Sequence, residues 1–472
     1  MDKDSLNKKL NYLKSYMDVT KNAATLSAVD SNANVTSRNV ATMFAELPKE
    51  DTIAVNRAIV EEYLLKLFGE GLVNSFREDM KHHILYSHDE SSLMPYCVAI
   101  SLYPYLLDGL KPLGGTSGPP KHSDSFIGGL TNLIFLIAGQ FAGAVAVPET
   151  IPYLDHFLRV DYGEDYTNHL DDIVESFGNR RYTLRKKIED LFQQFVYCVN
   201  QPAAARGYQS PFVNIAYFDR GYFNSIFKDF VFPDGDEANY ESTVVLQKMF
   251  MKWFNKERTK EVITFPVETM NLLYDKDTKK FVDEDMADFT AEMWAEGHSF
   301  FLYNSDSADA LSSCCRLKNG IENNVFSYTL GAGGLRTGSK KVITLNLNRI
   351  TQDWDRSGRK EDLEEYIGTI VKRVHKYLIA WNEWLKDLYR AGLLTVYSAG
   401  YISLEDQYLT TGINGGLEAA EYLGIETRAD NLEYQKFMNS ILTKIKNINL
   451  EDRTPETKFN TEFVPKACGH LK

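Results

Sequence analysis

The chain has 472 residues, of which 44% are hydrophobic and 25% charged, a composition typical of globular proteins rather than disordered or collagen-like ones. Its formal net charge of −13 disfavours a protein that coats nucleic acid or a membrane surface, because such proteins present a basic face. We therefore expect neither nucleic acid nor a membrane as a partner, whereas a small anionic ligand needs only a local pocket.

Taken in chain order, apolar residues recurring three and four positions apart predict helices over residues 51–81, 165–200, 236–261, 283–300, 361–394 and 431–449. Short extended pieces between them predict strands at 96–102, 213–219, 262–267, 342–348 and 395–402. Strands that alternate with long helices indicate an α/β fold. Because no internal repeat and no linker rich in Pro, Gly or Ser divides the chain, we expect one large domain.

One uncharged segment could be mistaken for a membrane span. It runs from Ser125 to Val147 and is long enough to cross a bilayer. Asn132 and Gln140 lie inside it, glycines dilute it, and one of its flanks lacks a clear basic anchor. We therefore interpret it as a helix buried in the core of a large protein.

The cysteines and the N-terminus indicate the compartment. Five cysteines are too few and too irregularly spaced for a disulfide framework, and they lie at Cys97, Cys198, Cys314, Cys315 and Cys468. The N-terminus lacks the apolar stretch and cleavage site of a secretory signal. Both observations predict a cytoplasmic protein.

The adjacent pair Cys314 and Cys315 is the most unusual local feature. A closed zinc site needs four ligands, and no second pair with suitable spacing exists, so zinc is disfavoured and we expect no metal site. Arg316 would favour a thiolate if the segment were partly exposed. A buried pair of small apolar side chains explains the residues equally well.

Glycines and histidines leave further alternatives open. The glycine-rich segment 331–341 is predicted to be a loop, and a strand follows it, so neither the Walker nor the Rossmann context is met. The glycines after Thr410 precede a helical pattern and could either bind an anion or simply begin the helix. His82, His83 and His88 could bind a metal, move protons, or cap and solvate a helix end.

Several segments, in their order and spacing, together resemble the anaerobic (class III) ribonucleotide reductases over residues 51–465. The segments are YSHDESSLMPYC, GPPKHSDSFIGGLTNLIF, SPFVNIAYFDRGYF, ITFPVETMNLLYD, SSCCRLKNG, KKVITLNLNRI, GINGGLEAAEYLG and FNTEFVP.

The resemblance implies a ten-stranded α/β barrel of two antiparallel halves, with outer helices and a central finger loop near 311–320. Residues 1–50 would form an N-terminal helical segment, 51–465 the catalytic barrel and 466–472 an atypical tail. Family members are homodimers that reduce ribonucleotides, usually triphosphates. A separate activase that uses S-adenosylmethionine installs their glycyl radical, and dNTP or ATP effectors can set their substrate specificity.

The resemblance also implies roles for single residues. Cys315 matches the cysteine that becomes a thiyl radical, and Cys314 is the less favoured choice. Cys97 matches the second cysteine of members that use formate as reductant, and His88 is a candidate to orient formate or transfer a proton. A thioredoxin-like donor is the alternative reductant.

Further residues are implied as contacts to the substrate. They are Ser123 and Ser125 as polar contacts, Asn346 as a ribose contact, and Asn414, Gly415 and Gly416 as the phosphate site.

Two departures from the family pattern shape the expected function. The tail after residue 465 lacks the radical-glycine motif and the four-cysteine zinc site, and no ATP-cone motif precedes Asp51. We therefore expect a split or interrupted reductase that binds no cofactor of its own and needs a C-terminal glycyl-radical polypeptide as partner. The alternative is an inactive remnant that binds nucleotides or forms a dimer.

Overall fold

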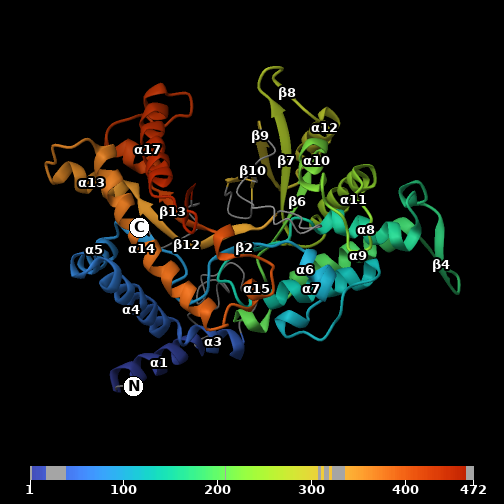
Figure 1. Ribbon diagram of the computed structural model, residues 1–472, viewed down its shortest axis with the longest axis horizontal. Helices are drawn as coiled ribbons and strands as arrows, with labels where there is room; N and C mark the ends of the chain where they lie inside the picture. Colours follow the sequence, from blue (N-terminus) through green and yellow to red (C-terminus); the bar gives the residue numbers. More distant parts are fainter. Residues whose placement is uncertain are drawn as a thin grey trace.

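The computed structural model describes residues 3–17, 39–207, 209–306, 310–312, 318–320 and 335–463 (Figure 1). Helices dominate its N-terminal part: α1 (Lys3–Met17), α3 (Val40–Glu46), α4 (Lys49–Phe68) and α5 (Glu70–Lys81). The single helix predicted over 51–81 is therefore two helices. They are separated by Gly69, whose φ of 84° is a conformation that glycine adopts readily and other residues rarely do.

Ten strands form one sheet at the centre of the molecule. Its strands are β1 (Leu85–Ser87), β2 (Cys97–Ala99), β3 (Val145–Ala146), β6 (Val213–Phe218), β7 (Val267–Asp275), β8 (Lys280–Phe281), β9 (Phe301–Ser305), β12 (Thr337–Asn346), β13 (Tyr408–Asn414) and β14 (Lys458–Phe463). The order is β14-β13-β12-β2-β3-β6-β7-β8, with β1 paired to β12 and β9 paired to β7.

Strand direction divides eight of these ten strands into two halves, each with its own strands parallel, while β1 and β8 run antiparallel to their neighbours β12 and β7. One half contains β2, β3, β6, β7 and β9, and the other contains β12, β13 and β14. The halves meet at the antiparallel pair β2 and β12, in which Cys97 lies opposite Ser339. The ten strands confirm the predicted α/β class. They also confirm that the two halves run antiparallel to each other. Among the strands that the structure describes, no pairing between β14 and β9 closes the sheet into a ring.

Helices cover both halves (Figure 1). On the half with β2 lie α6 (Tyr103–Asp108), α7 (Ser123–Ala138), α8 (Thr150–Tyr162), α9 (Leu184–Val199), α10 (Arg220–Phe227), α11 (Tyr240–Arg258) and α12 (Glu284–Ala295). On the other lie α13 (Leu347–Arg356), α14 (Leu363–Arg390), α16 (Gly416–Tyr422) and α17 (Leu432–Glu451), with α4 packed against α14, whereas α15 (Thr395–Ser398) contacts the 3-10 helix Lys111–Leu113. Short 3-10 helices lie at Lys111–Leu113, Tyr166–Asn168, Ala204–Arg206 and Leu404–Asp406.

The uncharged run is a buried helix over residues 125–138, as predicted, whereas residues 139–147 form a turn and strand β3. The helix is α7, in which Phe126, Leu130 and Leu133 are fully buried. A helix that packs on other protein along most of its length can be apolar nearly all round. Within the described residues, none of the helices combines the length and the apolar character that crossing a membrane would require.

Other sequence predictions were wrong at particular segments. Of the α-helix predicted over 165–200, only 184–199 is α-helical. Before it, β4 (Ile173–Phe177) and β5 (Arg180–Thr183) form an exposed hairpin. Residues 395–402, predicted as a strand, begin with helix α15, and β7 starts only at Val267. In the segment predicted as a glycine-rich loop, residues 337–341 belong to β12.

Candidate active site

The inner face of the ten-stranded sheet carries small and polar side chains. Alternate residues of a strand point to opposite faces, so Val98 and Ile100, which belong to the main apolar cluster, lie opposite to Cys97. The same alternation applies to the other strands. On the inner face it places Cys97, Ala99, Ala146, Asn214, Thr269, Thr344, Thr410 and Asn460. A face of this kind can surround a polar ligand, whereas the outer face packs against helices.

Cys97 is held tightly at the start of β2. Its thiol is buried, and its sulfur accepts a hydrogen bond from the backbone N–H of Ala144 at 3.3 Å. Gly143 lies so close that a Cβ placed on it would be 2.5 Å from the Cys97 sulfur. On the other side, the Gln407 amide donates to the Cys97 carbonyl at 2.9 Å. These contacts fix the position of the thiol.

A row of hydrogen-bonded polar side chains begins beside Cys97 and crosses the half of the sheet that contains β12, β13 and β14. Ser339, the strand partner of Cys97, has its Oγ 2.7 Å from the Thr410 hydroxyl, which donates to the Asn460 amide oxygen at 2.8 Å. The row therefore crosses β12, β13 and β14. Sequence reasoning missed it, because neither YLTTGIN nor KFNTEF shows the regular alternation of apolar and polar residues that predicts a strand.

His88 lies beside the same strand, directly after β1. Its N–H donates to the Val342 carbonyl at 3.1 Å, and its Nε2 is 2.8 Å from the Thr344 hydroxyl. Its ring also packs edge-on against Tyr96, the residue before Cys97, with centroids 5.8 Å apart. The structure therefore brings His88 and Cys97 to one edge of β12. His82 and His83 are exposed, and His82 is bonded to Glu78.

Burial sets the charge of His88. Loss of contact with water, and secondly the positive charge of Lys341, lower the pKa of His88 to about 4, so its ring is neutral at pH 7. Lys341 is itself buried and donates from Nζ to the His88 carbonyl at 2.5 Å, with its ammonium 4.7 Å from the centre of the Trp381 ring. Burial lowers the pKa of Lys341 to about 8.

The predicted phosphate site forms a second group at the carboxyl ends of two parallel strands. Asn346 and Asn414 are register partners at the ends of β12 and β13. Gly415 follows with a φ of 74°, and Gly416 begins α16. The Asn346 amide is already engaged, since it accepts from the Arg349 N–H at 3.1 Å and donates to the His83 carbonyl at 3.2 Å.

These two groups lie at opposite ends of β12. Ser339, beside Cys97, and Asn346 are separated by seven residues of strand, or roughly 23 Å at 3.3 Å per residue. The roles predicted for the second group stay predictions.

Ser123 and Ser125 lie at the start of α7, away from Cys97. The Ser123 hydroxyl donates to Asp161 at 2.6 Å, and the Ser125 hydroxyl donates to the His122 carbonyl at 2.8 Å. The segment that contacts Cys97 follows the other end of this helix, which is about 22 Å away at 1.5 Å per residue. The structure does not group these serines with Cys97, and their role as substrate contacts stays a prediction.

Cys314 and Cys315 lie outside the described residues, as does Cys468. In sequence the pair falls between β10 (Ala310–Ser312) and β11 (Lys318–Gly320), which pair antiparallel. Cys198 lies on α9, away from the inner face. Over the described ranges, no group of three or more His, Cys, Asp or Glu residues is arranged to hold a metal ion.

Comparisons with known proteins point to one family. A family model described as anaerobic ribonucleoside-triphosphate reductase matches residues 41–467. The anaerobic ribonucleotide reductase from Thermotoga maritima, solved with citrate in the active site, is 30% identical. It aligns with a TM-score of 0.80 over 99% of this chain and 81% of that chain.

Two other solved structures agree. Another anaerobic ribonucleotide reductase is 31% identical, with a TM-score of 0.79 over 99% of this chain and 72% of that chain. The Thermotoga maritima enzyme in complex with dATP and CTP is 29% identical, with a TM-score of 0.77 over 100% of this chain and 78% of that chain. A search of curated proteins found no match.

Proposed function

This chain belongs to the anaerobic ribonucleoside-triphosphate reductase family, and we propose that it reduces ribonucleoside triphosphates to deoxyribonucleotides by thiyl-radical chemistry. One observation carries this proposal. The Cys97 thiol is buried on the small, polar inner face of the sheet, at the strand pair where its two halves meet. A thiol held there is shielded from water, which protects radical intermediates from side reactions.

In the proposed reaction, a thiyl radical on Cys315 abstracts the 3′ hydrogen atom of the ribose. The 2′ hydroxyl then takes up a proton and leaves as water, while the Cys97 thiol supplies a hydrogen atom to C2′. Formate is the proposed reductant. It is oxidised to carbon dioxide, so that ribonucleotide, formate and one proton give deoxyribonucleotide, carbon dioxide and water.

His88 and Lys341 support formate as the reductant. A neutral imidazole can donate a hydrogen bond to a carboxylate or relay its proton, and His88 is neutral at pH 7. The buried ammonium of Lys341, bonded to the His88 carbonyl, adds a positive charge close to this position. We propose that His88 orients formate next to Cys97.

Membership of this family also suggests the subunit, activase and nucleotide partners of the chain. We propose a homodimer whose glycyl radical is installed by an activase that uses S-adenosylmethionine. The Thermotoga maritima enzyme has been solved with dATP in its specificity site and with dATP and CTP together. For this chain we likewise propose ribonucleoside triphosphates as substrates and dNTP or ATP as specificity effectors.

The test is dCTP formation from CTP without oxygen. The chain is combined with activase, S-adenosylmethionine, a glycyl-radical polypeptide and either formate or a thioredoxin-like donor. We expect product with formate, loss of product in Cys315→Ser and Cys97→Ser, and retained turnover in Cys198→Ser. Absence of dCTP with either donor would reject the proposed reaction, and equal loss in all three variants would indicate a folding defect.

A further inference from the structure

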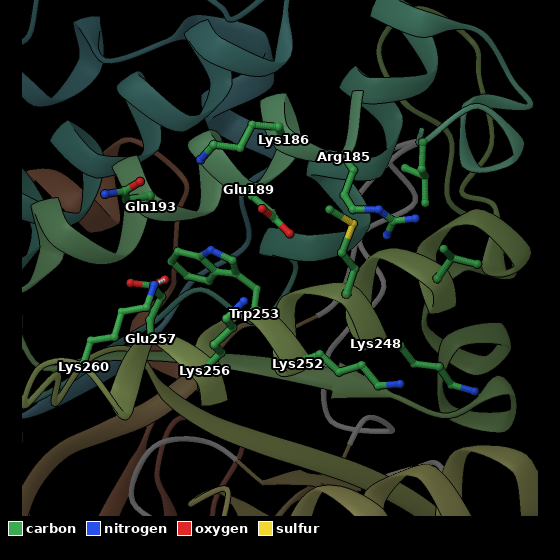
Figure 2. A pocket seen from close by; sticks show the side chains of 13 residues that line it. Arg185, Lys186, Glu189, Gln193, Lys248, Lys252, Trp253, Lys256, Glu257 and Lys260 are labelled. Atoms are coloured by element: carbon green, nitrogen blue, oxygen red, sulfur yellow. Dashed lines mark hydrogen bonds and ion pairs between the residues drawn. The ribbon is translucent and has the colours of Figure 1, made fainter. Parts of the chain in front are cut away.

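A basic groove lies between α9 and α11, outside the sheet and separate from Cys97. Figure 2 shows its side chains, which come from both helices and from the residues after α11. Its volume is about 540 Å³, within the range of small-ligand sites. The floor includes Trp253, which packs against Phe192 with ring centroids 5.8 Å apart. The floor is therefore fixed by aromatic packing.

The charge of the groove is opposite to that of the whole protein. Six cations line it, namely Arg185, Lys186, Lys248, Lys252, Lys256 and Lys260. Glu189 and Glu257 line it with them, and Asp171 and Asp190 form ion pairs with Arg185 and Lys186, so six cations face four carboxylates and the formal charge is +2 in a chain of net charge −13. Such a local concentration of one sign attracts an anion of opposite charge.

Three of the lysines pair with no acidic residue that the structure describes. Lys248, Lys252 and Lys256 follow one another at four-residue spacing on α11, so their side chains leave one face of the helix about 6 Å apart. None of the three forms an ion pair within the part of the chain that the structure describes. Lys248 and Lys252 lie 5.2 and 5.4 Å from the centre of the Phe289 ring. By contrast, Lys186 and Lys260 are paired with Asp190 and Glu257.

We propose that this groove binds a polyphosphate chain, either free or as part of a nucleoside triphosphate. A triphosphate carries about four negative charges at neutral pH, and an extended anion of this kind can reach lysines that leave α11 at successive helical turns. A single phosphate carries at most about two negative charges, fewer than the three lysines without an ion pair. The site goes beyond the proposed reaction, because it uses none of the residues of the inner face.

The experiment measures binding of tripolyphosphate and of ATP to the full chain by calorimetry. The test variant is Lys252→Gln with Lys256→Gln. The control is Lys436→Gln with Lys446→Gln, which removes the same charge from exposed positions on α17. We expect the test variant to weaken tripolyphosphate binding at least tenfold and the control to leave it unchanged.

Each outcome has a defined meaning. Equal affinity for the two ligands, lost in the test variant, supports recognition of the phosphate chain alone. Tighter binding of ATP that is also lost in the test variant supports a nucleoside triphosphate as the ligand. Absence of tripolyphosphate binding, or the same affinity in both variants, overturns the proposal. Because no turnover is measured, these results do not depend on the proposed reaction.

Discussion

At the scale of single residues, the burial of His88 gives the protein a defined response to pH. Its pKa is about 4 in the folded chain and near 6.5 when unfolded. As the pH falls below 6.5, the unfolded chain binds a proton that the native chain does not bind. Stability therefore decreases between pH 6.5 and pH 4, and this contribution levels off below pH 4.

We expect His88 to account for about 2 kcal/mol of lost stability between pH 6.5 and pH 5, at 1.36 kcal/mol per pH unit. The measurement is the free energy of unfolding at both pH values for the native chain and for His88→Gln, which cannot titrate. The variant should lose less stability on acidification. The same pH dependence in both proteins would contradict a neutral, buried His88.

Close packing around the Cys97 sulfur makes Gly143 sensitive to one added methyl group. In Gly143→Ala the new Cβ would lie 2.5 Å from this sulfur and 3.0 Å from the Tyr96 carbonyl oxygen. We expect a loss of about 1–3 kcal/mol in unfolding free energy, as for other overpacked cores, together with reduced turnover. Gly118→Ala is the control, because nothing lies within 4 Å of its added Cβ. Equal stability of the two variants would contradict this packing.

At the scale of elements, the Arg206 side chain stabilises the turn between α7 and β3 through hydrogen bonds. Its guanidinium donates to the carbonyls of Ala138, Phe141, Ala142 and Gly143, at 2.9–3.2 Å. The same turn supplies the N–H that bonds the Cys97 sulfur. A single side chain therefore links the position of the turn to the position of the thiol.

We expect Arg206→Met to lower the unfolding free energy by roughly 2–4 kcal/mol, since several carbonyls would lose a charged donor. Cys97 should also react faster with iodoacetamide, which mass spectrometry can follow. Arg77→Met is the control, because Arg77 forms an exposed ion pair with Glu61 that contributes about 0–1 kcal/mol. An unchanged alkylation rate in Arg206→Met would show that the turn does not hold the thiol.

Long amphipathic helices were predictable from the sequence, and short strands were less so. The apolar residues that recur three and four positions apart over 236–261, 361–394 and 431–449 correspond to α11, α14 and α17. Each of these long helices buries one regular stripe of apolar side chains. The strands β13 and β14 were missed, since their polar side chains face the interior of the sheet rather than solvent. The hairpin at 173–183 was missed because the sequence of its exposed strands does not alternate regularly between apolar and polar residues.

The candidate site was predictable only where a motif named its residues. Cys97 and His88 came from the resemblance, and the structure brings both to one edge of β12. Ser339 was missed because its segment looked like a loop, and its position depends on pairing with a strand more than 200 residues away. Sequence periodicity is local, so it cannot reveal such register partners.

At the scale of the whole molecule, the two halves of the sheet are joined at the antiparallel pair β2 and β12. Gly338 lies in this pair with a φ of 150°, and a Cβ placed on it would be 2.3 Å from the Cys97 carbonyl oxygen and 3.0 Å from the Val98 Cα. Backbone atoms within a sheet cannot move aside as a flexible side chain can. The join therefore requires glycine at this position.

We expect Gly338→Ala to destabilise both halves together, by about 3 kcal/mol or more, because the clash separates strands that both halves share. Hydrogen exchange measures this directly: amides of β13 in one half and of β6 in the other should both exchange faster than in the native chain. Gly71→Ala is the matched control, with open space around its added Cβ on α5. If faster exchange were confined to β2 and β12, the two halves would be independent folding units, and the strand pair would hold Cys97 without holding the molecule together.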